Sequence, residues 1–158
     1  MTKISAEEIK KLREITGARV LDCKKALEEA EGDLKKAEAL VAEKGLARAE
    51  KNQDRATTAG LIAHYVHSNG KVGALVEIRC ETDFVAQNSE FQEMAKNVAM
   101  QVVAMNPATV EELLEQDFIR DSSIKIETLI KLLSGKIGEK MVLTRFKRFE
   151  LGEEIASE

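Results

Sequence analysis

The sequence is poor in aromatic residues and in cysteine. Its 158 residues include one tyrosine, five phenylalanines and no tryptophan, so a hydrophobic core must be built mainly from Ala, Val, Ile and Leu. The two cysteines, Cys23 and Cys80, are far apart and form no CxxC pair. This usage is typical of a reducing cytoplasm rather than a secreted disulfide scaffold. No apolar run approaches the ~20 residues of a membrane-spanning helix, so no membrane partner is expected.

A strong excess of charge of either sign is also missing. The formal net charge is −4, and residues 1–55 hold 13 Lys/Arg against 12 Asp/Glu, while the remainder holds 11 against 16. A nucleic-acid-binding domain usually has a clear positive excess, so we expect no direct contact with nucleic acid. Met1 to Ser5 lead straight into a helix signal, which predicts no signal peptide.

Motifs that bind nucleotides or metals are absent as well. There is no GxxxxGK[ST], and no GxGxxG follows a strand, so no nucleotide is expected to bind to this chain. His64 and His67 are three apart on a predicted strand and point to opposite faces, so they cannot share a metal ion. Cys80 with a nearby histidine could act as a thiol nucleophile, but its place on an apolar face favours an inert core residue. We therefore expect no cofactor, no metal and no catalytic residue.

The N-terminal third has the pattern of three short amphipathic helices. Ser5-Ala6-Glu7-Glu8 is a capping box, and Gly17 ends the first helix. The second helix is expected over Val20–Ala30, and the third is expected to stop at Gly45. A charged linker that is helical in part follows, so we predict a three-helix bundle with its linker over residues 1–55. The inner faces are expected to hold Ile9, Leu12, Ile15, Ala26, Leu27, Ala30, Leu34, Ala37, Leu40 and Val41.

A period of two replaces the helical period in the middle of the chain. Asn69-Gly70 is a hairpin-turn signal, and placing it at the turn pairs Ser68 with Lys71. One strand face is then nearly all apolar, which is the consistency that a correct register should give. That face collects Leu61, Ala63, Tyr65, His67, Val72, Ala74, Val76, Ile78 and Cys80. The opposite face collects His64, Glu77 and Arg79 among Ile62, Val66 and Leu75.

Helices and one more strand are predicted after the hairpin. The helices are expected at 89–105, 109–118 and 123–136. Gly135 and Gly138 are expected to flank the end of the last helix. A strand over 141–151 should join the hairpin in a three-stranded antiparallel sheet, with a bulge near Lys147-Arg148, where the alternation slips. The fold class is α+β: a helical bundle followed by a core of sheet and helices over residues 56–158.

Between the hairpin and the next helix, Thr82, Asp83 and Phe84 stand at a turn. A turn held between a strand and a helix is a rigid place to present a side chain. Two interpretations fit the spacing equally well. In one, Asp83 caps the following helix and Phe84 packs against it as a hydrophobic staple. In the other, Phe84 is displayed to a partner.

Three segments resemble the signatures of the elongation factor Ts family, in the family's order. They are Thr16-Gly17-Ala18 with Asp22-Cys23-Lys24-Lys25-Ala26-Leu27, then Cys80-Glu81-Thr82-Asp83-Phe84-Val85-Ala86, and then Lys136-Ile137-Gly138-Glu139 before a basic strand. The resemblance implies a guanine-nucleotide exchange factor for elongation factor Tu, the GTPase that delivers aminoacyl-tRNA to the ribosome. It also implies that no covalent chemistry takes place and that the bundle is a ubiquitin-associated-like module.

The resemblance also implies which residues contact elongation factor Tu. In the helical module, the residues that match the contact with the nucleotide-binding domain are Arg13, Val20, Leu21 and Lys24. The segment that matches an insertion beside the Mg²⁺ site is Thr82, Asp83, Phe84 and Val85. Ile137 and Gly138 match a further contact on the core. Phe84 would act as a wedge between partner helices, and Asp83 would hold the loop or accept from a partner's backbone.

Two departures from the family pattern stand out. Where the family commonly has Gly-Met-Met, this chain has Arg19-Val20-Leu21, so Arg19 adds bulk and charge at the expected interface. Longer members carry a second core subdomain and a coiled coil, and residues 108–136 are too few for either. Short members can compensate by packing one core sheet against its twin. We therefore predict a non-covalent homodimer.

Other classes of function remain as alternatives. A ubiquitin-associated-like adaptor without exchange activity would explain residues 1–45 but would leave the other two segments unexplained. A thiol enzyme would need an exposed Cys80. The expected location is the cytoplasm, or the stroma or matrix of an organelle.

Overall fold

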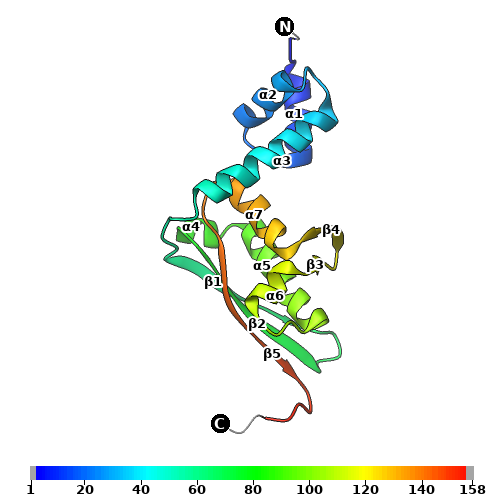
Figure 1. Ribbon diagram of the computed structural model, residues 1–158, viewed down its shortest axis with the longest axis vertical. Coiled ribbons are helices and arrows are strands. Elements are labelled where there is room, and N and C mark those ends of the chain that lie inside the picture. Colours follow the sequence, from blue (N-terminus) through cyan, green and yellow to red (C-terminus); the bar gives the residue numbers. More distant parts are fainter. Residues whose placement is uncertain (1–2, 156–158) are drawn as a thin grey trace. The chain divides into compact units, whose positions relative to one another are not determined.

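The computed structural model describes residues 3–155 and contains helices, one main sheet and a small ribbon. Figure 1 labels the elements in chain order. They are α1 (Ala6–Thr16), α2 (Val20–Glu29), α3 (Leu34–Lys51), β1 (Ala59–Val66), β2 (Val72–Cys80), α4 (Asp83–Ala86), α5 (Ser89–Met105), α6 (Val110–Glu115), β3 (Asp117–Phe118), β4 (Asp121–Lys125), α7 (Ile126–Ile137) and β5 (Val142–Glu150). The α+β class and the three-stranded antiparallel sheet are confirmed.

The chain divides into two compact units. The first contains the N-terminal helices through Asp54 together with Lys131–Glu139, and the second contains Arg55–Ile130 and the chain from Lys140 onward. The sequence placed residues 131–139 with the core, whereas here they pack with the N-terminal helices. That the bundle and the core are separate functional domains stays a prediction.

The predicted caps of α1 are confirmed at both ends. The Ser5 hydroxyl accepts from the Glu8 N–H at 3.2 Å, and the Glu8 carboxylate accepts from the Ser5 N–H at 2.7 Å. Gly17 has φ 63°, and its N–H donates to the Arg13 carbonyl at 2.7 Å. Glycine adopts this left-handed conformation at little cost, so α1 ends where the sequence predicts.

The core of the first unit is made of small and branched apolar residues. Its buried members are Leu12, Ala18, Cys23, Ala26, Leu27, Ala30 and Ala37. The expectation that Ile15 lies inside is wrong, because its side chain is 49% exposed. Thr16 turns inward instead: its hydroxyl donates to the Leu12 carbonyl at 2.8 Å and lies 3.8 Å from the Cys23 thiol.

Gly45 does not end α3, and Gly135 does not flank the end of α7. Both lie inside helices, and α3 continues to Lys51. A Cβ added to Gly135 would overlap the backbone of Gly45. Glycine at position 135 therefore allows the two helices to approach backbone to backbone, which is a tertiary use of glycine that the local sequence does not reveal.

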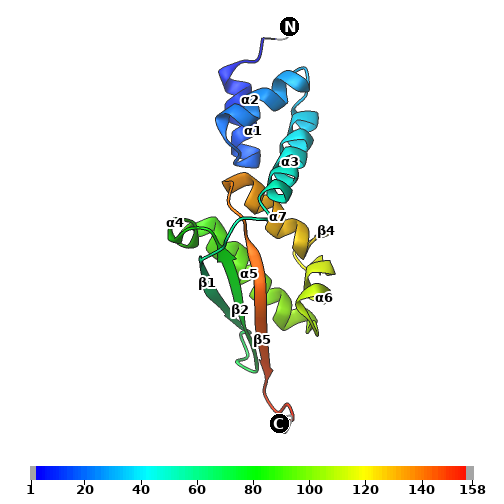
Figure 2. The same cartoon turned by 60° about the vertical axis from the view of Figure 1, so that its left-hand side comes forward.

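The hairpin has the predicted register. Tyr65 pairs with Ala74 and Val66 pairs with Gly73, which is the alignment that pairs Ser68 with Lys71. Ala63, Val76, Ile78 and Cys80 of the predicted apolar face are buried. Figures 1 and 2 show α5 along one face of the sheet, where it packs on β1 and β2. The buried residues of α5 are Phe91, Met94, Ala95, Val98, Ala99, Gln101, Val102 and Val103.

Two predicted helix ends are wrong. The helix expected over 109–118 ends at Glu115, and the one expected over 123–136 begins at Ile126. Residues 117–118 and 121–125 form the antiparallel ribbon β3–β4 instead. The cause is Gln101, which is fully buried in α5. Its side-chain amide donates to the Asp117 carbonyl at 3.0 Å and accepts from the Ile119 N–H at 3.0 Å. These bonds fix an extended backbone beside the helix.

The bulge between β2 and β5 lies away from its predicted place. Glu77 pairs with Arg145 and Ile78 pairs with Leu143, so the unpaired residue is Thr144. The alternation slips near Lys147-Arg148 for another reason. Arg148 points to the helix side of the sheet, where its guanidinium donates to the Val103 carbonyl at 3.2 Å.

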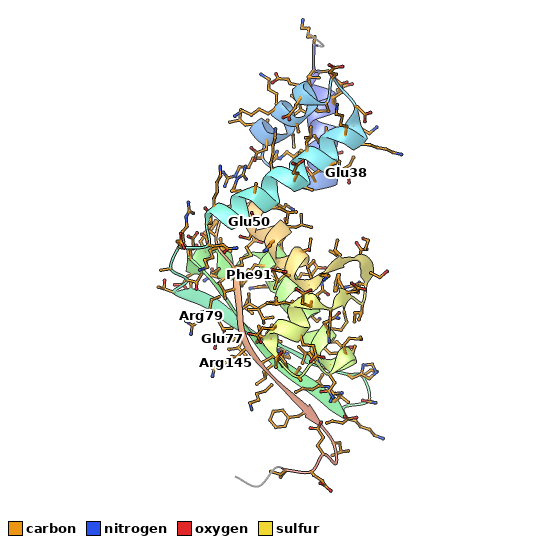
Figure 3. The ribbon with its side chains drawn as sticks, viewed as in Figure 1. Glu38, Glu50, Glu77, Arg79, Phe91 and Arg145 are labelled. Atoms are coloured by element: carbon orange, nitrogen blue, oxygen red, sulfur yellow. The ribbon has the colours of Figure 1, made fainter. Side chains whose placement is uncertain are left out.

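The bulge is held by a charged cluster on the outer face of the sheet (Figure 3). The Glu77 carboxylate accepts from Thr144 Oγ1 at 2.8 Å, from Arg79 Nε at 3.0 Å and from Arg145 Nε at 2.9 Å. These hydrogen bonds, of which the one from Thr144 acts most strongly, lower the pKa of Glu77 from 4.5 to about 2. The carboxylate is therefore stabilised in its ionised form.

Glu77→Gln should weaken the dependence of stability on pH. The lowered pKa means that the folded state resists protonation while the unfolded state takes up a proton, so this part of the stability is present above pH 4.5 and is lost as the pH falls toward about 2. Urea unfolding at several pH values across that range would measure the slope. Glu38→Gln, on the exposed surface of α3 (Figure 3), is the matched control. Equal slopes for the wild-type protein and Glu77→Gln would contradict the assignment.

Alanine should have opposite effects at the two packed glycines. Gly135→Ala drives a methyl group into the backbone of Gly45 and should lower the free energy of unfolding by about 1–3 kcal/mol. Gly45→Ala meets its nearest neighbouring atom at 3.9 Å, an ordinary contact, and should gain up to ~1 kcal/mol from helix propensity. Chemical denaturation of both variants measures the difference. If Gly135→Ala were as stable as Gly45→Ala, the close approach would not exist in solution.

Candidate functional site

The Thr82–Val85 segment is the start of a short helix rather than an open turn. Thr82 has extended backbone angles, and its hydroxyl accepts from the Val85 N–H at 3.3 Å. Thr82 is thus the N-cap of α4, a position where threonine is favoured. A second cap follows at once, because the Asn88 side chain accepts from the Glu90 N–H at 2.8 Å at the start of α5.

One side of α4 is fixed to the core. Val85 and Ala86 are buried, and α4 packs on β1 and β2. The Cys80 thiol donates to the Thr82 carbonyl at 3.2 Å, and the Gln92 amide donates to the Ala86 carbonyl at 3.4 Å. The helix is therefore tied to the strand before it and to the helix after it. Val85, which the family resemblance assigned to partner contact, serves as part of this anchor.

Phe84 points away from the core. Its side chain is 85% exposed, although burying a large aromatic ring away from water is energetically favourable. The staple interpretation is wrong, because a staple requires the ring to pack against α5. The companion idea, that Asp83 caps α5, is wrong as well, since Asn88 occupies that cap. Asp83 lies instead in the first turn of α4.

Apolar residues are also exposed at the start of α2. Val20 and Leu21 are about half and two-thirds exposed, at 49% and 69%. Lys24 lies one turn after Val20, so the two share a helix face, and its ammonium is 3.9 Å from the Glu28 carboxylate. Arg13 is exposed on α1, as is Ile15, half of whose side chain is in contact with solvent. The sequence analysis missed Ile15, because helical spacing placed it inside.

The Ile137-Gly138 segment lies against the beginning of α2. Arg19 Nη2 donates to the Ile137 carbonyl at 3.1 Å. Gly138 has φ 90°, and a Cβ there would lie 2.6 Å from Arg19 Nη2. Arg19 is exposed and makes this contact within the chain, and that it also adds bulk and charge at the partner interface stays a prediction.

The structure thus groups the predicted contact residues in two places. Those in the first unit are Arg13, Val20, Leu21, Lys24, Ile137 and Gly138, and those in the second are Thr82, Asp83, Phe84 and Val85. The first group combines exposed apolar side chains with cations. The second presents one aromatic ring on an anchored helix.

Nothing between residues 3 and 155 forms a recognisable catalytic or metal centre. Cys23 and Cys80 are both buried, which excludes the thiol enzyme that would need an exposed Cys80. No group of three or more His, Cys, Asp or Glu side chains in this range is arranged to hold a metal ion. Within the same range, none of the helices has the length and apolarity needed to cross a membrane.

These features define an α+β protein with exposed apolar side chains on both of its units. Comparison with known proteins then gives its family. Residues 81–158 match the family model described as Elongation factor TS. The chain is 43% identical to elongation factor Ts of Solidesulfovibrio magneticus, with 98% of this chain and all of that protein covered. It is 41% identical to the chloroplastic elongation factor Ts of Rhodomonas salina, with 96% and 90% covered.

The chain belongs to the elongation factor Ts family, whose members are non-catalytic nucleotide exchange factors for elongation factor Tu. The likeness to elongation factor Ts of Thermotoga neapolitana, 43% identical with 96% of this chain covered, extends the match to another bacterium. The alignment with the Solidesulfovibrio protein runs over 199 positions, more than the 158 residues of this chain. That relative therefore contains residues without a counterpart here, in agreement with a short form.

Proposed function

We propose that this protein releases GDP from elongation factor Tu by inserting Phe84 beside the Mg²⁺ and phosphate side of the nucleotide site. The observation that carries the proposal is the exposure of Phe84 on a helix that is otherwise anchored. An exchange factor must bind the nucleotide-poor state of its partner better than the GDP-bound state, because only a difference in affinity shifts the equilibrium. A ring that fits the partner after Mg²⁺ and GDP have loosened supplies such a difference.

The anchoring of α4 supports this wedge role. Thr82 caps the helix and Val85 is buried beneath it, so Phe84 is held before the partner arrives. Pre-organisation reduces the ordering cost on binding. Displacing the groups that hold Mg²⁺ would loosen the ion, which normally neutralises the charge of the GDP phosphates. The negative charges would then repel one another, and GDP would be held less tightly. Asp83, at the exposed start of α4, would take a backbone donor of the partner.

The first unit provides the docking surface in this proposal. Val20 and Leu21 offer apolar area, and Arg13 and Lys24 surround it with positive charge. Ile137 and Gly138 add a contact from the end of α7. Burial of such an apolar centre with a polar rim is the usual anatomy of a specific interface. The same proposal places the protein where elongation factor Tu works, in the cytoplasm or in an organellar stroma or matrix.

The outer face of the sheet supports a homodimer. Its large apolar side chains are exposed, although α5 covers the other face: they are Ile62, Val66, Leu75 and Phe149. They lie among Lys147, Arg145 and the Glu77 cluster. In the strand register Val66 and Phe149 both pair with Gly73, from either side, and Leu75 lies two residues further along β2 on the same face. An apolar patch on one side of a sheet marks an interaction site, and a second copy would bury it symmetrically.

Phe84→Ala should lose most of the stimulation of GDP release while keeping the fold. The ring is exposed, so its removal costs little stability, and only the wedge is lost. Stopped-flow measurement of labelled GDP leaving elongation factor Tu, at saturating concentration of this protein, gives the rate. We expect a fall of about tenfold or more.

The matched control is Met105→Ala, which removes a half-exposed apolar side chain at the far end of α5. It should leave the release rate unchanged. Undiminished stimulation by Phe84→Ala would remove the wedge from the mechanism. Absence of stimulation by the wild-type protein would reject the exchange function itself.

Leu75→Asp should convert the dimer to a monomer. A carboxylate in the centre of a sheet-to-sheet contact would have to be buried without a partner, which is costly. Sedimentation equilibrium at tens of micromolar, a range that roughly covers interfaces of standard size, would give the mass. Ser122→Asp, on the exposed β4 strand, adds the same charge elsewhere and should stay dimeric. A monomeric wild-type protein would contradict the homodimer.

A further inference from the structure

The C-terminal turn of α7 is held by side chains from the other helices of the first unit. Arg48 Nη1 donates to the Gly135 carbonyl at 2.9 Å, and Arg19 Nη2 donates to the Ile137 carbonyl at 3.1 Å. The Asn52 amide lies 3.5 Å from the Gly138 carbonyl. The last carbonyls of a helix have no partner within the helix and carry partial negative charge. Two guanidinium groups therefore donate hydrogen bonds to carbonyls at this helix end and place positive charge beside them.

The two arginines differ in what else they contact. Arg48 Nη2 also pairs with the Asp22 carboxylate at 3.0 Å, so this half-buried side chain joins α2, α3 and α7. Arg19 is the N-cap residue of α2 and makes no side-chain capping bond there. Its long side chain instead reaches from the start of α2 to the end of α7. It contacts Ile137 directly before the left-handed Gly138.

This contact joins two surfaces that are far apart in the sequence. Val20 and Leu21, which follow Arg19, are exposed, and Ile137 and Gly138 are the segment that Arg19 holds. Glycine at position 138 allows the Arg19 guanidinium to lie this close to the backbone, because a Cβ there would lie 2.6 Å from the guanidinium nitrogen. Its φ of 90° is also one that other residues rarely adopt. The arginine and the glycine therefore fit as a pair.

We propose that Arg19 is a positioning residue that joins the Val20–Leu21 surface and the Ile137-Gly138 segment into one pre-formed docking surface for elongation factor Tu. The proposal rests on the function proposed above. Binding to a surface that is already ordered avoids the cost of ordering it during association. Loss of Arg19 should therefore weaken docking and leave the wedge step unchanged, since Phe84 belongs to the second unit.

The test compares Arg19→Ala with Arg19→Lys in GDP release from elongation factor Tu. The release rate is measured over a range of concentrations of this protein, which separates the half-saturating concentration from the maximal rate. Loss of a charge-assisted hydrogen bond should raise the half-saturating concentration about fivefold for Arg19→Ala and leave the maximal rate as in the wild type. Arg19→Lys should recover part of the loss, because an ammonium group can still donate to the carbonyl.

A control variant and a second measurement complete the test. Lys35→Ala, exposed on α3, removes one positive charge without touching α7 and should behave as the wild type. In the free protein, hydrogen exchange should be faster at the Gly138 amide, which donates to the Ser134 carbonyl at 2.8 Å, in Arg19→Ala than in wild type. An unchanged half-saturating concentration with unchanged amide exchange would overturn the proposal.

The remaining outcomes are also decisive. A lower maximal rate with an unchanged half-saturating concentration would overturn the docking role of Arg19. If the wild-type protein does not accelerate GDP release, the proposed function fails. Amide exchange then still decides whether Arg19 holds the Ile137-Gly138 segment, because that measurement uses this protein alone.

Discussion

The register of the β1–β2 hairpin is the constraint on which the second unit depends. A shift of one residue would turn every side chain to the opposite face, so the turn at Asn69-Gly70 decides which face α5 can cover. The same register brings Cys80 to the buried face at the end of β2. From there its thiol bonds to the Thr82 carbonyl at 3.2 Å, and α4 begins on a fixed strand end. The exposure of Phe84 is thus a consequence of a turn at Asn69-Gly70, 14 residues or more before it in the chain.

Signals that act within a few residues could be read from the sequence, and they were sufficient for most of the fold. The capping box at Ser5, the left-handed Gly17 and the hairpin register all depend on local backbone chemistry. Gly135 could not be interpreted in this way, because a glycine that allows close helix packing looks the same in the local sequence as one that ends a helix. Gln101 is a similar case: a polar residue in an amphipathic helix gives no sign that it will hold a ribbon sixteen residues further on.

In the candidate site, too, some features could be predicted from the sequence and others required the three-dimensional structure. Family resemblance named the residues, but only the geometry showed that Phe84 is exposed while Val85 is buried beneath it. Spacing alone left the staple and the displayed ring equally plausible. The exposure of the Phe84 ring excludes the staple, and Asn88, which caps α5, excludes the cap that was assigned to Asp83. Arg19 lies on the surface, but its hydrogen bond to the Ile137 carbonyl could not be predicted, because the two residues are 118 apart in the sequence.

The arrangement also separates two tasks that an exchange factor must perform. Contacts that are equal in the GDP-bound and nucleotide-free states of the partner increase affinity for both and release nothing. Under the proposed function, the surface formed by Val20, Leu21 and Ile137 would provide that general docking, and the affinity would increase with how rigidly Arg19 holds the surface. A contact that improves only as Mg²⁺ and GDP leave must come from a side chain that enters the partner. Under the proposed function, Phe84 would meet that requirement, because α4 holds its backbone while leaving the ring in solvent. Docking affinity and GDP release would then be altered independently, the first through residues of the bundle and α7, the second through α4.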